Sequence, residues 1–177
     1  MPTIGVAVAI PEPWATELQE YRTSVGDTTA SMIPTHITLV PPTRVGEDLA
    51  DLQRHLTDAS AGVPAYRVHL RGTGTFRPVS AVVFVAVAEG IAECEHLERT
   101  IRTGPLAQEL RFNYHPHVTV AHEVPDAALD AAFDEMATYE ARFEVAGFSL
   151  YEHGDDGVWR PEQVFPLTAD AGTATGS

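Results

Sequence analysis

Two short segments of this sequence share one pattern of polar and apolar residues, and they lie far apart in the chain. Residues 36–40 read HITLV and residues 117–121 read HVTVA. Both alternate polar with aliphatic residues, which is the period of a strand that buries one face. The second segment begins about half the chain after the first, in a sequence of 177 residues. The repeat predicts two similar lobes, each contributing one such strand.

The rest of the chain intersperses strands with helices. Apolar and β-branched runs predict the strands, and apolar spacings of three and four predict the helices. Turn-forming sequences at 76–80 and 153–157 indicate hairpins, and hence antiparallel pairing. We therefore expect an α+β fold with two pseudo-symmetric lobes whose antiparallel sheets flank a central cleft. The expected strands are 4–10, 36–40 (stopped by Pro41-Pro42), 65–76, 81–87, 117–122, 142–152 and 158–167. The expected helices are 11–25, 47–59, 89–110 (broken near Gly104-Pro105) and 126–139.

Residues 1–167 are expected to form this single bilobal domain, and the small polar residues 168–177 to be a disordered tail. The one cysteine, Cys94, excludes an internal disulfide. No apolar run approaches the roughly 20 residues that cross a bilayer, and the N-terminus lacks the features of a secretory signal. These observations predict a cytoplasmic protein that does not enter membranes, and nothing in the sequence demands more than a monomer.

The charge of the chain restricts its partners. The net charge is −14, and the sequence contains no lysine. Proteins that grip long nucleic acids need clustered basic residues to displace counterions, so we expect no such partner. A small nucleotide or a short oligonucleotide phosphodiester needs only a few local donors and remains a suitable ligand.

The two repeated segments carry side chains suited to phosphodiester chemistry. Residues i and i+2 of a strand share a face, so His36 projects with Thr38 and His117 with Thr119. One imidazole can remove a proton from the attacking oxygen while the other protonates the leaving oxygen. The unperturbed pKa of histidine, about 6.5, allows one neutral and one charged ring near neutral pH. The threonine hydroxyls can donate hydrogen bonds to the phosphate oxygens.

Other residues near the second segment are further candidates for ligand binding. His115 precedes Pro116, which favours an extended conformation, and it is predicted to bind substrate on the same face as His117. His122 lies at an odd separation from His117 and should point to the opposite face, which disfavours a metal site. We expect no metal ion and no cofactor. The aromatic side chains of Phe76, Phe112 and Tyr114 could stack on a base.

The stretches THITLVPP and PHVTVAHEVP resemble the two HxTx motifs of the 2H phosphoesterase superfamily, which includes the bacterial 2′-5′ RNA ligase-like proteins. GTGTFRPVSAVVFVAV is similar to the central strand pair of that family, and FSLYEHGDDGVWRPEQVFPL to its closing hairpin. The resemblance implies a bilobal fold and metal-independent phosphoesterase chemistry, with His36 and His117 as acid and base and Thr38 and Thr119 on the phosphate. The chain departs from the ligase-like members at His122, where they commonly carry arginine, and in its acidity.

The leading hypothesis is a phosphodiesterase that cleaves a 2′,3′-cyclic or other cyclic nucleotide phosphate, or a 2′,5′ phosphodiester. A module that binds nucleotides or phosphate without turnover is one alternative. A 2′-5′ RNA ligase is the other, and the absence of a basic cluster speaks against it.

Overall fold

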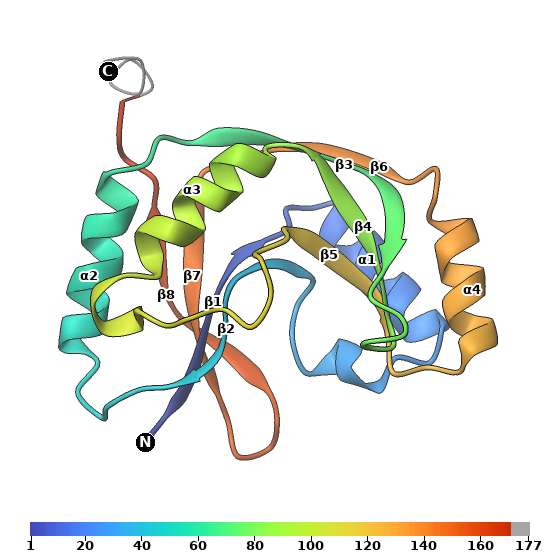
Figure 1. Ribbon diagram of the computed structural model, residues 1–177, viewed down its shortest axis with the longest axis horizontal. Helices are drawn as coiled ribbons and strands as arrows, with labels where there is room; N and C mark the ends of the chain where they lie inside the picture. Colours follow the sequence, from blue (N-terminus) through green and yellow to red (C-terminus); the bar gives the residue numbers. More distant parts are fainter. Residues whose placement is uncertain (171–177) are drawn as a thin grey trace.

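The computed structural model describes residues 1–170 and builds them around one antiparallel sheet of eight strands in the order β6-β3-β4-β5-β2-β1-β7-β8 (Figure 1). The strands are β1 (Thr3–Ala9), β2 (His36–Arg44), β3 (Tyr66–Thr75), β4 (Val82–Glu89), β5 (His117–His122), β6 (Glu140–Val145), β7 (Gly147–His153) and β8 (Trp159–Pro166). The helices are α1 (Trp14–Ser24), α2 (Ala50–Ala61), α3 (Ile91–Ile101) and α4 (Asp126–Glu135), with 3-10 turns η1 (Thr28–Ser31) and η2 (Gly104–Leu106).

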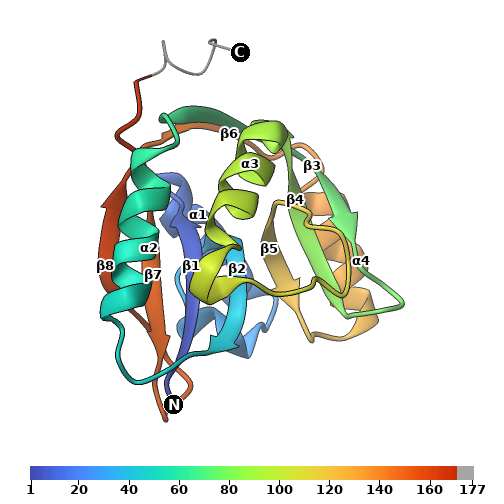
Figure 2. The ribbon, with the colours of Figure 1, turned by 60° about the vertical axis from the view of Figure 1, so that its left-hand side comes forward.

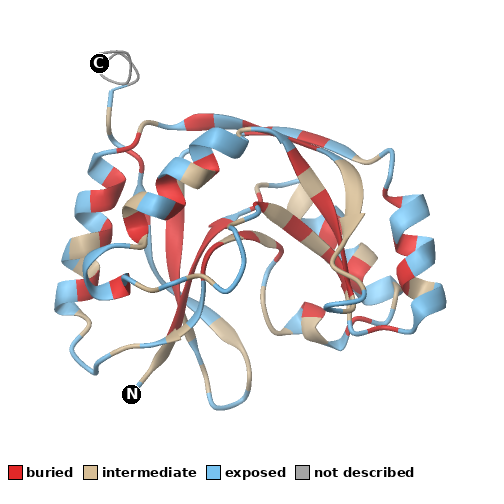
Figure 3. Cartoon of the chain, viewed as in Figure 1, coloured by how far each residue is buried: buried red, intermediate tan, exposed pale blue. Residues whose placement is uncertain are grey.

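The sheet divides into two halves of four strands, each covered by two helices. Strands β2, β1, β7 and β8 carry α2 and α3, whereas β5, β4, β3 and β6 carry α1 and α4 (Figures 1 and 2). Buried residues concentrate on the strands and on the inward sides of the helices (Figure 3). The predicted α+β fold with two lobes is confirmed, and the two sheets prove to be halves of one continuous sheet.

The two lobes meet where the middle residues of the repeated segments face each other. Among the described residues, the register between β2 and β5 consists of one pair, Ile37 opposite Val118. Both side chains are fully buried in the core. Because neighbouring residues alternate faces, the flanking histidines and threonines project away from that core. The pair therefore lies at the centre of an approximate twofold arrangement.

The strand of the first motif contains a bulge directly after its threonine. Val6 and Ala7 are adjacent on β1, but they pair with Val40 and Thr38, which are two residues apart on β2. Leu39 is the extra residue, and such an extra residue shifts the alternation of everything beyond it.

The second motif has a bulge at the equivalent place. Val83 of β4 pairs with Ala121 and Phe84 pairs with Thr119, which leaves Val120 as the extra residue. The bulge turns His122 to the same side as Thr119, whereas a regular strand would have turned it away. The prediction that His122 points to the opposite face is therefore wrong.

The prediction that β2 stops at Pro41 is also wrong. The strand continues to Arg44, which pairs with Thr3, and Thr43 pairs with Ile4. A proline cannot donate to the sheet but is accepted where its strand lacks a neighbour on one side. β2 meets β5 only at Ile37, so the prolines lie on such an open stretch.

The single strand predicted at 142–152 consists of two strands in different halves of the sheet. β6 pairs with β3, whereas β7 pairs with β1 and β8. The chain crosses between them at Ala146 and Gly147. A Cβ at Gly147 would lie 2.8 Å from the carbonyl oxygen of Phe165, so the crossing requires the close backbone approach that glycine permits.

The helix predicted at 89–110 is interrupted near Gly104-Pro105, as expected, but residues 107–110 beyond the interruption are not helical. α3 ends at Ile101, η2 follows, and the loop then runs along β2, where Gln108 donates to Thr43 and Tyr114 to the carbonyl of Thr38. At the other end of the chain, the amide of Thr168 donates to the carbonyl of Ser60, and the rest of the predicted tail from 171 onward lies outside the described residues. No helix within residues 1–170 is long and apolar enough to cross a membrane.

Gly74 makes room for the ring of Phe84, which packs against His117 of the second motif. Gly74 pairs with Phe84, and an added Cβ would lie 2.5 Å from Cζ of that ring. Overpacking of this kind costs about 1–3 kcal/mol, so Gly74→Ala should lower the free energy of unfolding by that amount in urea denaturation. Gly46→Ala is the control, because nothing lies within 4 Å of its added Cβ. Equal stabilities for the two variants would contradict this packing.

Candidate active site

Each motif histidine is held through the same ring nitrogen. Nδ1 of His36 lies 2.8 Å from the carbonyl oxygen of Pro34, and Nδ1 of His117 lies 2.7 Å from that of His115. A carbonyl oxygen can only accept, so in both rings Nδ1 carries the proton. The neutral rings then present an unprotonated Nε2, which is the form that can accept a proton from a reacting group.

Burial favours the neutral form of both rings in the unliganded protein. It lowers the pKa of His36 to about 4, the bond to the carbonyl of Pro34 acts in the opposite direction, and the nearby Arg22 and His117 lower the pKa further. Burial also lowers the pKa of His117, against the raising effect of the bond to the carbonyl of His115. A charged ring near neutral pH is therefore disfavoured without a ligand. An anion in the cleft would favour the charged form of either ring.

The hydroxyl of Thr38 is hydrogen-bonded to Nε2 of His36, the ring nitrogen that would take part in proton transfer. Oγ1 of Thr38 lies 3.1 Å from Nε2 of His36, and since Nδ1 carries the ring proton, the hydroxyl is the donor. The hydroxyl of Tyr114 fixes the same segment from outside by donating to the carbonyl oxygen of Thr38 at 2.8 Å. The first motif is thus positioned by its own strand and by the loop before β5.

Aromatic rings surround the second histidine. The ring of His117 lies 4.9 Å from that of Phe76 and 5.1 Å from that of Phe84, with the Phe76 contact edge-on. His115 packs against Phe84 at 5.2 Å and is itself exposed. Contacts of this kind fix the plane of the imidazole and exclude water from its edges, which agrees with its lowered pKa.

Two cavities open from the motifs and share Thr38 and Pro41. The first, which we call the aromatic pocket, has a volume of 410 Å³ and is lined by Thr38, Leu39, Pro41, Phe76, Val79, Ser80, Glu98, Leu110, Phe112, Asn113, Tyr114, His115 and His117. The second, the arginine pocket, has a volume of 340 Å³ and is lined by Gly5, Val6, Ala7, Arg22, Thr29, Ile33, His36, Thr38, Val40, Pro41, Pro42, Thr119, His122, Tyr151 and Trp159. The two histidines therefore open onto different halves of one cleft.

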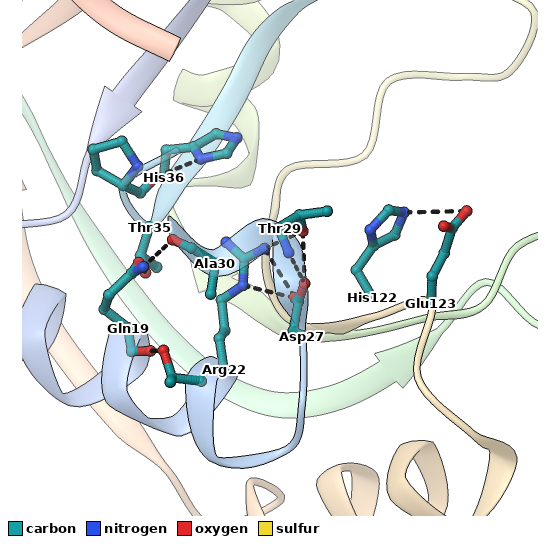
Figure 4. A network of polar contacts seen from close by, with 11 residues as sticks. Gln19, Arg22, Asp27, Thr29, Ala30, Thr35, His36, His122 and Glu123 are labelled. Atoms are coloured by element: carbon teal, nitrogen blue, oxygen red, sulfur yellow. Dashed lines mark hydrogen bonds and ion pairs between the residues drawn. The ribbon is translucent and has the colours of Figure 1, made fainter. Parts of the chain in front are cut away.

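The entrance to β2 is held by a polar network from α1 and η1 (Figure 4). Gln19 donates to the carbonyl of Ala30 and accepts from the hydroxyl of Thr35, the residue before His36. Arg22 of the same helix is buried and bonds to Asp27 and Thr29. The network fixes the backbone from which His36 projects.

All five predicted site residues line this cleft, as do the three aromatic residues considered for base stacking. His36, Thr38 and Thr119 border the arginine pocket, and His115 and His117 border the aromatic pocket. The predicted roles of these residues remain predictions. His122 joins the arginine pocket through its bulge and lies in the other half of the cleft from His117. Within residues 1–170, no group of three or more His, Cys, Asp or Glu side chains is arranged to hold a metal ion.

Sequence reasoning missed Arg22 as part of the cleft. It lies one turn after Leu18 on the buried side of α1, and a charged residue on such an apolar stripe was the available signal. Phe84 was also missed, because its sequence context is that of any buried central strand.

Several known proteins are similar to this chain. A Bacillus licheniformis protein named "Putative phosphoesterase" is 28% identical over 146 residues, spanning 81% of this chain and 86% of that protein. A Geobacillus thermodenitrificans protein of the same name is 24% identical over 142 residues, spanning 78% and 82%. Among solved structures, TT0787 of Thermus thermophilus has a TM-score of 0.62 at 24% identity and covers 96% of this chain and 100% of its own.

E. coli LigT complexed with 3′-AMP has a TM-score of 0.61 at 18% identity and covers 95% of this chain and 99% of its own. These structural likenesses show a shared fold. The sequence model of the 2′-5′ RNA ligase superfamily matches residues 10–157, a range that contains both motifs and most of the chain. The chain therefore belongs to the 2′-5′ RNA ligase superfamily, in agreement with the resemblance of its motifs to those of 2H phosphoesterases.

Proposed function

We propose that this protein is a metal-independent phosphodiesterase that cleaves a cyclic nucleotide phosphate, such as a 2′,3′-cyclic end, or a 2′,5′ phosphodiester. The observation that carries the proposal is the pair of imidazoles in one cleft, each with Nδ1 bonded to a carbonyl, which makes Nε2 the nitrogen for proton transfer. Nε2 of His36 accepts from Thr38 in the unliganded protein, and a phosphate that takes up the Thr38 hydroxyl would release it. Acid and base are then both side chains of the protein, so the reaction as proposed needs no metal-bound water.

In the proposed reaction, the neutral Nε2 of one histidine removes a proton from water as its oxygen attacks the phosphorus. The bond from phosphorus to the 2′ or 3′ oxygen breaks, and the other histidine, in its charged form, gives its proton to that oxygen. Thr38 and Thr119 donate hydrogen bonds to the two non-bridging oxygens, where negative charge increases in the transition state. A second proton transfer through solvent restores both rings.

The aromatic pocket is the proposed place for the nucleobase. Phe76, Phe112 and Tyr114 line it beside His117, and Phe112 has 62% of its surface exposed. An exposed aromatic ring at the rim of a pocket is suited to stack on a base. The similar proteins named as phosphoesterases support the reaction class, and E. coli LigT has been crystallised with 3′-AMP, NADP⁺ and ATP, which supports a small nucleotide as ligand.

The alternatives make different demands on the same cleft. A binding module would hold a nucleotide without product formation and would not need a free Nε2 on each ring. A 2′-5′ RNA ligase would have to bind two RNA ends, which the net charge of −14 disfavours. Both motifs come from one chain, so the proposed enzyme is complete as a monomer.

Removing either motif histidine tests the mechanism. His36→Gln and His117→Gln should each lower turnover of nucleoside 2′,3′-cyclic monophosphates by about 10²–10⁴-fold, because each removes one proton-transfer group. His96→Gln, on the exposed side of α3, is the matched control and should leave turnover unchanged. EDTA should have no effect on the wild type. Turnover that requires added zinc would overturn the proposal.

The lowered histidine pKa values predict that anion binding is coupled to proton uptake. A bound anion raises a histidine pKa from its low unliganded value, about 4 for His36. Affinity should therefore increase as pH falls from 8 toward 6, by up to about tenfold per pH unit for one proton. Sulfate is a suitable probe because its charge is constant in this range, and calorimetry in buffers of different ionisation enthalpy counts the protons.

The double variant His36→Gln/His117→Gln controls for titration elsewhere in the protein and should show no such increase. A wild-type affinity that stays constant between pH 8 and pH 6 would contradict protonation of the motif histidines on anion binding.

Base stacking in the aromatic pocket can be tested separately. Phe112→Ala should raise KM for adenosine 2′,3′-cyclic phosphate about 5- to 150-fold, since stacking is worth about 1–3 kcal/mol per base, with little change in kcat. Phe133→Ala, an exposed aromatic of α4 outside the cleft, serves as the control. An unchanged KM for the Phe112 variant would place the base elsewhere.

A further inference from the structure

The arginine pocket contains a buried guanidinium for which the two-histidine reaction has no role. Arg22 is only 4% exposed and projects from the last turn of α1. A buried charge is costly unless it is paired and hydrogen-bonded, so its partners are informative.

Two neighbours hold one edge of the guanidinium. Oδ2 of Asp27 accepts from Nε at 3.0 Å and forms an ion pair with Nη2 at 2.9 Å, and Oγ1 of Thr29 accepts from Nη2 at 3.1 Å. The other oxygen of Asp27 accepts from the amide and hydroxyl of Thr29 at 2.9 Å and 2.6 Å. Asp27 and Thr29, which hold this side of the guanidinium, are thus also hydrogen-bonded to each other.

The remaining nitrogen, Nη1, has no hydrogen-bond partner among the described residues. No fully buried side-chain nitrogen or oxygen in residues 1–170 lacks a partner, so Nη1 keeps some accessible surface, and the cavity that Arg22 lines is the arginine pocket. Its two N–H groups are the ones that this rigid arrangement leaves for a ligand.

The composition of the pocket shows which kind of ligand suits it. In a protein of net charge −14, none of the residues that line the arginine pocket is Asp or Glu. The side chains beside Arg22 that carry polar atoms are Thr29, His36, Thr38, Thr119, His122, Tyr151 and Trp159. The charge of Arg22 is also felt at the ring of His36, whose pKa it lowers. A cation with hydroxyl and imidazole neighbours and no carboxylate at the surface is suited to an anion.

We propose that Arg22 binds a phosphate oxygen of the substrate through Nη1, with Asp27 and Thr29 as positioning residues that hold the guanidinium toward the pocket. The inference rests on the proposed function for the identity of the substrate. Asp27 also compensates the charge of Arg22, which allows the arginine to stay buried when no anion is bound. In a chain without lysine, this gives the cleft one permanent cation, independent of the protonation of its histidines.

The contrast between Arg22→Met and Asp27→Asn tests this assignment by binding, apart from turnover. Calorimetry with inorganic phosphate should show affinity reduced about 10- to 100-fold in Arg22→Met, the usual effect of losing one hydrogen bond to a charged group. Asp27→Asn keeps the cation and should bind phosphate at least as well as the wild type. If the three residues only fasten η1, the two variants should weaken binding equally, which would overturn the proposal.

Two further measurements separate ligand binding from folding. Arg142→Met, at an exposed arginine of β6, controls for the loss of one positive charge and should not change affinity. The pKa of His36, followed by NMR without ligand, should rise in Arg22→Met because a nearby cation is gone. If Arg22→Met does not fold, the apolar double variant Arg22→Met/Asp27→Leu replaces it, since it leaves no unpaired buried charge.

The phosphate group that Arg22 contacts can be identified by kinetics. Arg22→Met should impair hydrolysis of adenosine 2′,3′-cyclic phosphate and of its 5′-phosphorylated form equally if Arg22 binds the scissile phosphate. It should impair only the 5′-phosphorylated form if Arg22 binds a second phosphate. Unimpaired hydrolysis and binding of both compounds would overturn the proposal. A wild type that binds phosphate through Arg22 but hydrolyses neither compound would leave this inference intact and refute the proposed cleavage of a 2′,3′-cyclic end.

Discussion

The contact on which the active cleft depends is the pairing of Ile37 with Val118 across the middle of the sheet. Both side chains are fully buried, so each strand must turn its neighbouring histidine and threonine the other way. Because the strands run antiparallel, His36 lies toward Thr119 and Thr38 toward His117. This apolar pair thus connects the two halves of the sheet through the core. As a result, four polar side chains from opposite halves of the chain lie close together in the cleft.

The bulges that follow each threonine extend this arrangement and then break its symmetry. Each bulge turns a later residue toward the cleft, and at equivalent positions these are Pro41 and His122. The surroundings of the two histidines differ more strongly. His117 lies among phenylalanine rings, whereas His36 shares its pocket with Arg22. A nearly symmetric scaffold therefore produces a cleft with two chemically different ends, which an asymmetric substrate such as a nucleotide requires.

Anion recognition in so acidic a protein depends on local geometry. The cleft combines neutral imidazoles, threonine hydroxyls and one arginine whose charge is compensated by Asp27. Such a site would attract the proposed phosphate group at short range, while the overall charge would repel long polyanions. Proton uptake by a histidine would add positive charge only when an anion is present, so binding and the protonation needed for catalysis are coupled in the proposed mechanism.

The sequence by itself determined where most of the strands lie, the pairing of His36 with Thr38 and of His117 with Thr119 on one face, and the likeness of the two halves, because alternation along a strand is a local property. It could not predict the side to which His122 turns, since a bulge depends on the register of the partner strand. The crossing at Gly147 likewise depends on a neighbour distant in sequence, because the backbone of Phe165 approaches it closely. Only the tertiary structure decided that Arg22 reaches the cleft, because the packing of α1 beside β5 and the turn through Asp27 and Thr29 determine what a buried guanidinium meets.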